Sequence, residues 1–290
     1  DVVVMMMGLS PRLEGEEMRV EVPGFKGGDR VALGLPLVQE ELIRAVAAVG
    51  KPVVFVLLNG SAVAVNWEAE HIPAIVEAWY PGQAAGTALA DVLFGKYNPA
   101  GRLPVTFSKS ADQIPAFSDY TMAGKTYRYF RGEPLFPFGH GLSYTTFTYS
   151  NLRIPSSVRT GEHIALAVDV TNSGKRDGEE VVQLYVTDLE ASAPVPIRSL
   201  QGFQRVHLKA GATKTVSFTL SPRQISLIDA ESRRVVEPGS FELSVGGKQP
   251  GSRGTADAST TGVVSGQFQV IGGKLQIDEK ANKRTVQEGL

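Results

Sequence analysis

The sequence predicts two domains of different fold class, an α/β domain with a largely parallel sheet followed by an all-β sandwich. Its 290 residues suit two domains of roughly 100–200 residues each. The first half alternates apolar strands with helical patterns, and the second half carries short strands of alternating polarity separated by turns. We therefore expect the α/β domain at residues 1–146, the sandwich at 147–272 and a polar tail at 273–290.

In the first half, an apolar run at residues 2–9 predicts a parallel strand covered on both faces. Residues 36–49 predict a helix with Leu37, Leu42, Val46 and Val49 on one face. Further strands are expected at 51–58 and 75–79, and further helices at 66–75 and 83–94, the last ending at a Gly95 cap. This order predicts a parallel sheet whose working loops follow the strand ends.

From about Phe147 the pattern changes to a two-residue period. Stretches at 163–171, 181–187, 214–220 and 240–245 predict strands of an antiparallel sandwich of the immunoglobulin or fibronectin type III kind. Residues 246–266 are rich in Gly, Ser and Thr, which predicts a mobile insertion or a strand connection, and a partly disordered end follows.

Composition excludes several functional classes. The 29 basic and 30 acidic residues give a net charge of −1, which offers no general attraction to nucleic acid or anionic membranes. Without cysteine there are no disulfides, thiolate metal sites or cysteine nucleophiles. The longest apolar runs are far shorter than the roughly 20 residues that span a bilayer. Neither a nucleic-acid partner nor a membrane partner is expected.

An acidic cluster, Glu14, Glu16 and Glu17, directly follows the first strand. A carboxyl that is buried beside other carboxylates has a raised pKa, which is what a general acid near neutral pH requires. A solvated acidic loop is the alternative interpretation.

Residues 127–131 and 134–144 form a compact segment of rings, prolines and glycines. It is either a latch between domains or a wall of a sugar site. His140 is interpreted as an interdomain hydrogen-bonding residue, because no nucleophile-elbow serine accompanies it. His71, His163 and His207 lack the spacing of metal ligands, and Asp29-Arg30 is interpreted as an ion pair or a loop anchor.

Taken in order, several motifs resemble the C-terminal half of glycoside hydrolase family 3, the β-glucosidases and β-xylosidases. The resemblance covers about residues 1–245. The motifs are GLSPRLEGEEM, GGDR, LPLVQEELI, GKPVVFVLLNGSAVAVNW, AWYPGQAAGTALADVLFGKYNPAGRLPVTF, TYRYF and PLFPFGHGLSYTTF.

The resemblance implies a retaining exo-acting β-glycosidase, without cofactor or metal, that removes terminal β-linked sugars. An N-terminal (β/α)8 barrel of the same enzyme would supply the aspartate nucleophile, and the α/β domain would supply the acid/base glutamate. Matching the family's E-x-E pattern assigns that role first to Glu16, then to Glu14, with Glu17 third. Glu17 and Arg12 are the expected substrate contacts, a β-glucoside is preferred over a β-xyloside, and a homodimer is a candidate assembly.

The chain departs from the family pattern because it has no barrel and no Ser-Asp-Trp nucleophile motif, and its sheet is expected to be incomplete at the N-terminal end. We expect it to be part of a longer polypeptide and to hydrolyse no glycoside alone. The alternative is a noncatalytic carbohydrate-binding or assembly module. The substrate class favours a periplasmic or secreted location, with the cytoplasm as the alternative.

Overall fold

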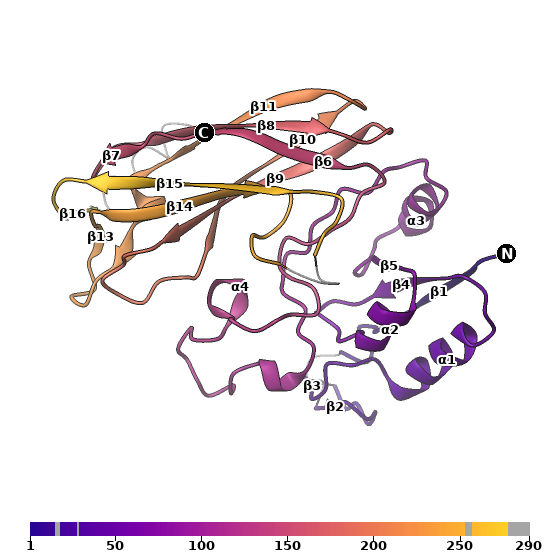
Figure 1. Ribbon diagram of the computed structural model, residues 1–290. Helices are drawn as coiled ribbons and strands as arrows, with labels where there is room; N and C mark the ends of the chain where they lie inside the picture. The colour runs from indigo at the N-terminus through magenta and orange to yellow at the C-terminus, as the bar shows by residue number, and fades with distance from the viewer. Residues whose placement is uncertain (15–17, 28, 253–256, 278–290) are drawn as a thin grey trace. The chain divides into compact units, whose positions relative to one another are not determined.

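The computed structural model describes residues 1–14, 18–27, 29–252 and 257–277, and its chain forms two compact units (Figure 1). The first unit consists mainly of Asp1–Tyr97 and Leu103–His140. The second consists mainly of Asn98–Arg102, Gly141–Gly251 and the described residues from Ala258 onward. Each unit has its own hydrophobic core.

The first unit is built on a three-stranded parallel sheet of order β1-β4-β5. Its strands are β1 (Val3–Gly8), β4 (Val53–Leu58) and β5 (Ala74–Glu77), and both pairings are parallel. The three strands expected from the sequence and their parallel order are confirmed. A short hairpin of β2 (Phe25–Lys26) and β3 (Asp29–Arg30) lies between β1 and the first helix in the chain.

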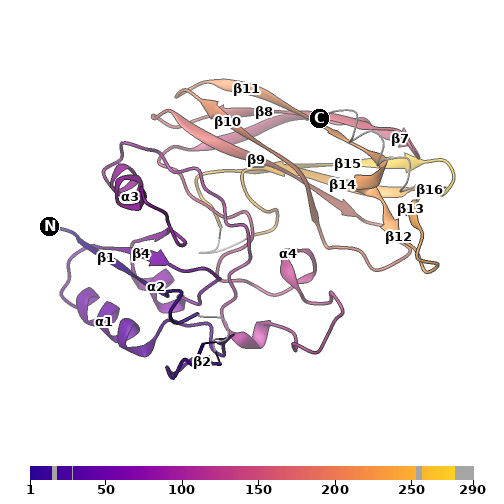
Figure 2. The ribbon, with the colours of Figure 1, turned by 180° about the vertical axis from the view of Figure 1, so that it is seen from behind.

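Helices cover this sheet from two sides. Figures 1 and 2 show α1 and α2 on one side of the sheet and α3 on the other. Gly95, directly after the C-cap of the third helix, has φ 71°, as expected of a glycine that ends a helix. The helical elements of this unit are α1 (Leu37–Ala47), α2 (Asn66–His71), α3 (Ala85–Leu93), the 3₁₀ turn η1 (Ala111–Gln113) and α4 (Thr126–Tyr129).

Two expectations about burial in this unit are wrong. The first strand is not covered on both faces, because Val4 and Met6 are 48% and 55% exposed while Met5 between them is buried. The buried side of α1 is also different: Ile43 is fully buried, whereas Leu37 and Leu42 are 66% and 51% exposed. Leucine spacing alone does not identify which apolar stripe of the helix faces the core.

The second unit is a β-sandwich of two sheets, with strand orders β10-β9-β14-β15-β7 and β11-β8-β6. All four strands expected from the two-residue period are confirmed within one or a few residues. The strands are β6 (Phe147–Arg153), β7 (Ser157–Arg159), β8 (Ile164–Asn172), β9 (Gly178–Asp188), β10 (Ser199–Leu208), β11 (Thr213–Leu220), β14 (Gly239–Gly246) and β15 (Val263–Ile271). A minor sheet of β12 (Leu227–Ile228), β13 (Arg234–Val236) and β16 (Leu275–Gln276) follows the turn η2 (Pro222–Ile225).

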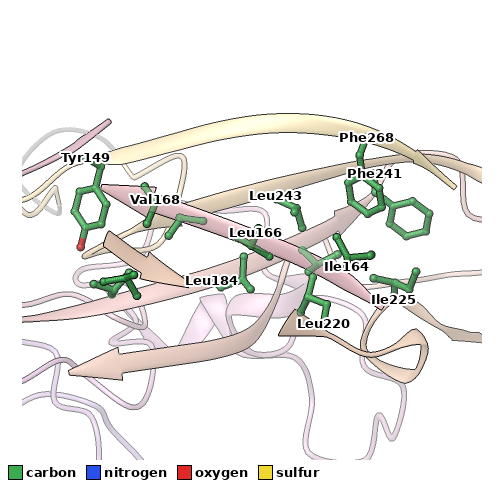
Figure 3. Packing of buried hydrophobic residues seen from close by; sticks show 14 of the residues in the cluster. Tyr149, Ile164, Leu166, Val168, Leu184, Leu220, Ile225, Phe241, Leu243 and Phe268 are labelled. Carbon is green, nitrogen blue, oxygen red and sulfur yellow. The ribbon is translucent and has the colours of Figure 1, made fainter. Parts of the chain in front are cut away.

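The sandwich core lies between the two sheets (Figure 3). Every second residue of β8 is buried, from Ile164 through Leu166 and Val168, because successive strand side chains point to opposite faces. Phe241 and Phe268 stack in this core with ring centroids 5.5 Å apart. These contacts make the sandwich a separately packed body.

A buried ion pair joins residues 98–102 to strand β9 of the sandwich. Arg102 Nη2 donates to Glu180 Oε1 over 2.6 Å, and both side chains are almost completely buried. Thr261 Oγ1 donates to the other oxygen of Glu180 over 2.8 Å. In its described residues, the segment between β14 and β15 is a strand connection with buried members such as Ala258. The polar tail expected at residues 273–290 is described only as far as residue 277, where it contributes β16, and its remaining residues lie outside the described part of the chain.

Candidate active-site loops at the carboxyl edge of the parallel sheet

The candidate site lies where β1, β4 and β5 end. Parallel strands present all their carboxyl ends at one edge of a sheet, so the loops that follow them converge there. Gly8 ends β1, and the side chain of Gln39 on α1 holds it in place: Gly8 N donates to Gln39 Oε1 over 2.9 Å, and Gln39 Nε2 donates to Gly8 O over 2.8 Å. Helix and strand therefore fix the point from which the acidic loop departs.

Glycine is required at this point. Gly8 has φ 144°, and a Cβ atom here would lie 1.9 Å from the carbonyl oxygen of Leu58. That close approach lets Leu9 N donate to Leu58 O over 2.7 Å directly after the strand. The acidic loop thus begins from a backbone arrangement that a side chain would prevent.

Glu14 is the described carboxylate of the acidic loop, and both of its oxygens are hydrogen-bonded. Ser61, in the loop after β4, donates its hydroxyl to Glu14 Oε1 over 2.7 Å. Tyr80, in the loop after β5, donates its hydroxyl to Glu14 Oε2. The loops that follow all three strands of the sheet therefore meet at this one carboxylate.

Arg30 lies beside this carboxylate and braces the loop after β4. Its Nη1 lies 4.0 Å from Glu14 Oε1 and donates to Ser61 Oγ over 2.9 Å. It also donates to the carbonyl oxygens of Ala62 and Leu33 over 2.8 and 2.5 Å. Burial lowers the pKa of Arg30, and the charge of Glu14 opposes this shift. The expectation that Arg30 anchors a loop is confirmed.

Tyr80 is held as a neutral hydroxyl donor. Burial, its hydrogen bond to Glu14 and the charge of that carboxylate raise the pKa of Tyr80. Its ring also packs closely on the loop after β4, because a Cβ atom at Gly60 would lie 2.7 Å from Tyr80 Cε2. Tyr80 can therefore donate to Glu14 at neutral and moderately alkaline pH.

A second carboxyl, Glu77, lies at the end of β5 in the same unit. Its Oε1 accepts a hydrogen bond from Trp79 N over 2.9 Å, and Trp79 has φ 55°, an uncommon conformation for a bulky residue. Burial raises the pKa of Glu77 to about 7, against the lowering effect of its hydrogen bonds with Trp79 N and the Asn59 side chain. Asn59 is fully buried and donates from Nδ2 to Ser61 O over 2.7 Å.

The residues expected to form the site have different outcomes. Glu14 points into the cluster, and its side chain is 16% exposed. Arg12 is exposed, and its expected contact with substrate stays a prediction. Glu16 and Glu17 lie outside the described residues.

Sequence reasoning missed five residues of this cluster: Ser61, Tyr80, Glu77, Asn59 and the Trp79 backbone. All five follow or end an expected strand, at 51–58 or at 75–79. That position was the available signal, since polar residues directly after parallel strands gather at one edge.

The aromatic segment packs within the first unit. Tyr127 and Phe138 stack with centroids 4.1 Å apart, and Phe136 meets Phe107 edge-on at 6.3 Å and His140 at 5.2 Å. The choice between latch and sugar wall, and the interdomain role of His140, stay predictions. In the described part of the chain, no group of three or more His, Asp or Glu side chains is placed to hold a metal ion, and no helix is long and apolar enough to cross a membrane.

Comparison with known proteins identifies both halves of the chain. Residues 1–144 match the glycosyl hydrolase family 3 C-terminal domain, and residues 180–249 match the fibronectin type III-like domain. This chain belongs to glycosyl hydrolase family 3, of which it carries the C-terminal α/β domain and the sandwich that follows. The resemblance expected from the motifs is confirmed.

The similar proteins include some named as β-xylosidases and some named as β-glucosidases. The chain is 46% identical over 245 residues to a xylan 1,4-beta-xylosidase of Xylanibacter ruminicola, covering 84% of this chain and 28% of that protein. It is 39% identical over 260 residues to a periplasmic beta-glucosidase of Salmonella typhimurium, covering 85% and 33%. A β-glucosidase structure from Erythrobacter marinus superposes with a TM-score of 0.79 at 35% identity, covering 93% of this chain and 34% of that one. The chain thus spans about a third of the length of these proteins.

Proposed function

We propose that this chain is the part of a retaining exo-acting β-glycosidase that supplies the acid/base glutamate. The observation that carries the proposal is the convergence of three loops on Glu14, which fixes the base of an acidic loop at the ligand-binding edge of a parallel sheet. The family membership and the names of the relatives support the reaction class.

The mechanism needs two carboxyl groups about 5–5.5 Å apart on opposite sides of the scissile bond. The nucleophile, on the barrel of the complete enzyme, attacks the anomeric carbon as the bond to the leaving oxygen breaks. The glutamate of this chain gives that oxygen its proton. In the second step the same glutamate removes a proton from water, which attacks the anomeric carbon and releases the nucleophile.

Glu16 remains the proposed proton donor, with Glu14 as the alternative. Both oxygens of Glu14 are occupied by hydroxyl donors and Arg30 lies nearby, which suits a residue that anchors the loop. Glu16 is two positions further along the chain. Glu17 and Arg12 are proposed to contact the sugar.

The test is a comparison of leaving groups in the polypeptide that carries both this chain and a barrel. Glu16→Ala should slow hydrolysis of a methyl or alkyl glycoside by about 10²–10⁴-fold. The same variant should slow hydrolysis of a dinitrophenyl glycoside far less, because that leaving group needs no proton. If Glu14→Ala shows this dependence on the leaving group and Glu16→Ala does not, Glu14 is the proton donor. Equal loss on both substrates in both variants would remove the role from Glu14 and Glu16 and leave Glu17, the third candidate, to be tested in the same way.

Substrate preference is a separate part of the proposal. The preferred β-glucoside and the alternative β-xyloside differ in the C6 group, and relatives with both names are similar to this chain. Rates of hydrolysis of matched nitrophenyl β-glucoside and β-xyloside decide between them.

We also propose a periplasmic or secreted location, which the name of one relative supports. We further propose that the 290 residues alone hydrolyse no glycoside.

A further inference from the structure

The carboxamide of Gln39 makes two hydrogen bonds to a single backbone residue, Gly8. Gly8 N donates to Gln39 Oε1 over 2.9 Å, and Gln39 Nε2 donates to Gly8 O over 2.8 Å. An amide side chain accepts only through its oxygen and donates only through its nitrogen. The backbone groups of Gly8 therefore fix the orientation of the Gln39 amide without ambiguity.

This pairing lies at the end of an edge strand. In the described sheet, β1 is at the edge, because the strand order is β1-β4-β5. The backbone of β1 is bonded to that of β4 at both ends, since Val3 N donates to Pro52 O and Leu9 N donates to Leu58 O. Gly8 N instead donates to a side chain of α1. At this residue the side chain of a helix takes the place that the backbone of a neighbouring strand would have.

The position of Gln39 is itself fixed by the packing of α1. Ile43, one turn further along the helix, is fully buried in the core of the first unit. Residues four apart lie on the same face of a helix. The face that anchors α1 in the core therefore also carries Gln39, so the amide is presented to the strand end by a packed element.

The backbone stays bonded along the loop that follows. Leu9 N donates to Leu58 O over 2.7 Å, and Glu14 N closes a turn by donating to Ser10 O over 3.0 Å. The Glu14 side chain is then held by hydroxyl donors from the loops after β4 and β5. Gln39 supplies the first contact of this series, at the point where the strand ends and the acidic loop begins.

We propose that Gln39 is a positioning residue for the proton-donating glutamate, an inference that rests on the proposed function. Its carboxamide fixes the strand end from which the acidic loop departs, and thereby the place at which the carboxyl of that loop meets the glycosidic oxygen. Gln39 itself gains and loses no proton. Proton transfer depends on geometry, and a displacement of about 1 Å can cost about 100-fold in rate.

The first test measures amide hydrogen exchange in this chain and does not depend on the proposed function. Gln39→Met keeps the length of the side chain and removes both bonds. The amides of Gly8, Leu9 and Glu14 should then exchange at least about tenfold faster than in the wild type. A Gly8 amide that is equally protected in the variant would overturn the proposal. A wild-type Gly8 amide that exchanges as fast as in an unfolded peptide would also overturn it, and this readout needs no variant.

Gln113→Met is the matched control. Gln113, in η1, makes the same two kinds of bond: Lys109 N donates to its Oε1 over 2.8 Å, and its Nε2 donates to Glu133 O over 3.0 Å. Its replacement should speed exchange at Lys109 and leave Gly8 and Leu9 as protected as in the wild type. Equal loss of protection at Gly8 in both variants would show a general loss of stability and would overturn the specific role of Gln39.

The second test uses the polypeptide that carries the barrel. In Gln39→Met, kcat/KM should fall about tenfold to 100-fold on a methyl glycoside but less than about twofold on a dinitrophenyl glycoside, because only the first leaving group needs the proton. A variant that is merely destabilised would lose both rates equally, and Gln113→Met should lose neither.

The two tests separate the inference from the proposed function. If the polypeptide has no glycosidase activity although Gln39→Met frees the Gly8 amide, the proposed function alone is contradicted. If the enzyme is active and Gln39→Met slows both substrates equally, or slows neither, the role of Gln39 alone is contradicted.

Discussion

The hydroxyl of Tyr80 donates a hydrogen bond to the carboxylate of Glu14, 66 residues earlier in the chain. The bond connects the loop after the first strand of the parallel sheet to the loop after the third. Ser61 adds the loop after the middle strand. The position of the acidic loop therefore depends on side chains that are distant in sequence and adjacent in the sheet.

Removing the Tyr80 hydroxyl should weaken this connection. Tyr80→Phe keeps the ring that packs on Gly60 and leaves Glu14 without one of its two donors, so we expect a loss of about 1–2 kcal/mol in the free energy of unfolding. Urea denaturation measures the loss. Tyr120→Phe is the control, since the Tyr120 side chain is 90% exposed and should tolerate the change. Equal stability of the two variants would show that the Tyr80 bond contributes nothing.

The stability of the first unit should depend on pH through Glu77. Its pKa in the folded state is about 7, above the ordinary value of 4.5. The folded state therefore holds a proton that the unfolded state releases between these values. The stabilisation is fully present below pH 4.5 and is lost as the pH rises to 7. The full pKa shift of Glu77 corresponds to about 3 kcal/mol in the free energy of unfolding. After allowance for the partial solvent access of the carboxyl, we expect about 1–2 kcal/mol.

Glu77→Gln should remove this component, because glutamine stays neutral. The difference in unfolding free energy between the variant and the wild type should move in favour of the variant by about 1–2 kcal/mol from pH 5 to pH 8. Histidine titrations are common to both proteins and cancel in the difference. A difference that does not change with pH would mean that Glu77 has an ordinary pKa.

The free energy of unfolding should fall when the buried Arg102–Glu180 ion pair loses one partner. Arg102→Met leaves Glu180 buried without its cation, and we expect a loss of about 3–5 kcal/mol at pH 7. Burial already raises the pKa of Glu180, with Arg102 opposing the shift. Without the arginine the carboxyl should take up a proton more readily, so the loss should be smaller at pH 5 than at pH 7.

Arg205→Met is the matched control for this pair. Arg205 pairs with Glu179 on the surface, and its side chain is 52% exposed. We expect a change below about 1 kcal/mol. If Arg102→Met and Arg205→Met lose similar amounts of unfolding free energy, burial does not determine what the Arg102–Glu180 pair contributes.

Gly8 should not tolerate a side chain. Gly8→Ala would place Cβ 1.9 Å from Leu58 O at φ 144°, and we expect a loss of about 3 kcal/mol or more. Gly86→Ala, in α3 with no atom within 4 Å of the added Cβ, should instead stabilise by about 0.5–1 kcal/mol. Thermal unfolding compares the two, and a tolerated alanine at Gly8 would show that the strand end can move.

Local patterns predicted the elements of this fold, because strand and helix periods are properties of neighbouring residues. The parallel strands, the sandwich strands such as β8, and the cap at Gly95 follow from them. Which face of a strand is covered depends on the rest of the fold, and this is why the exposure of Val4 and Met6 was not predicted.

The candidate site was predicted only in part for the same reason. An acidic loop at a strand end is visible in the sequence, so Glu14 was among the expected site residues, and its chemical role stays a prediction. The partners of Glu14 come from residues 61 and 80, and the buried pair joins residues 59 and 77. Only the lateral order of the strands brings these positions together, and periodicity does not encode that order.

We propose that the loop after β1 supplies the proton for glycoside cleavage. Azide rescue tests it most directly, because a small anion can attack the glycosyl-enzyme intermediate when the general base is missing. In the polypeptide that carries the barrel, Glu16→Ala should form a β-glycosyl azide from a dinitrophenyl β-glycoside, while Glu14→Ala should not. Azide product from Glu14→Ala alone would assign the proton to Glu14. If none of the alanine variants of Glu14, Glu16 and Glu17 forms an azide product, the loop after β1 does not supply the proton.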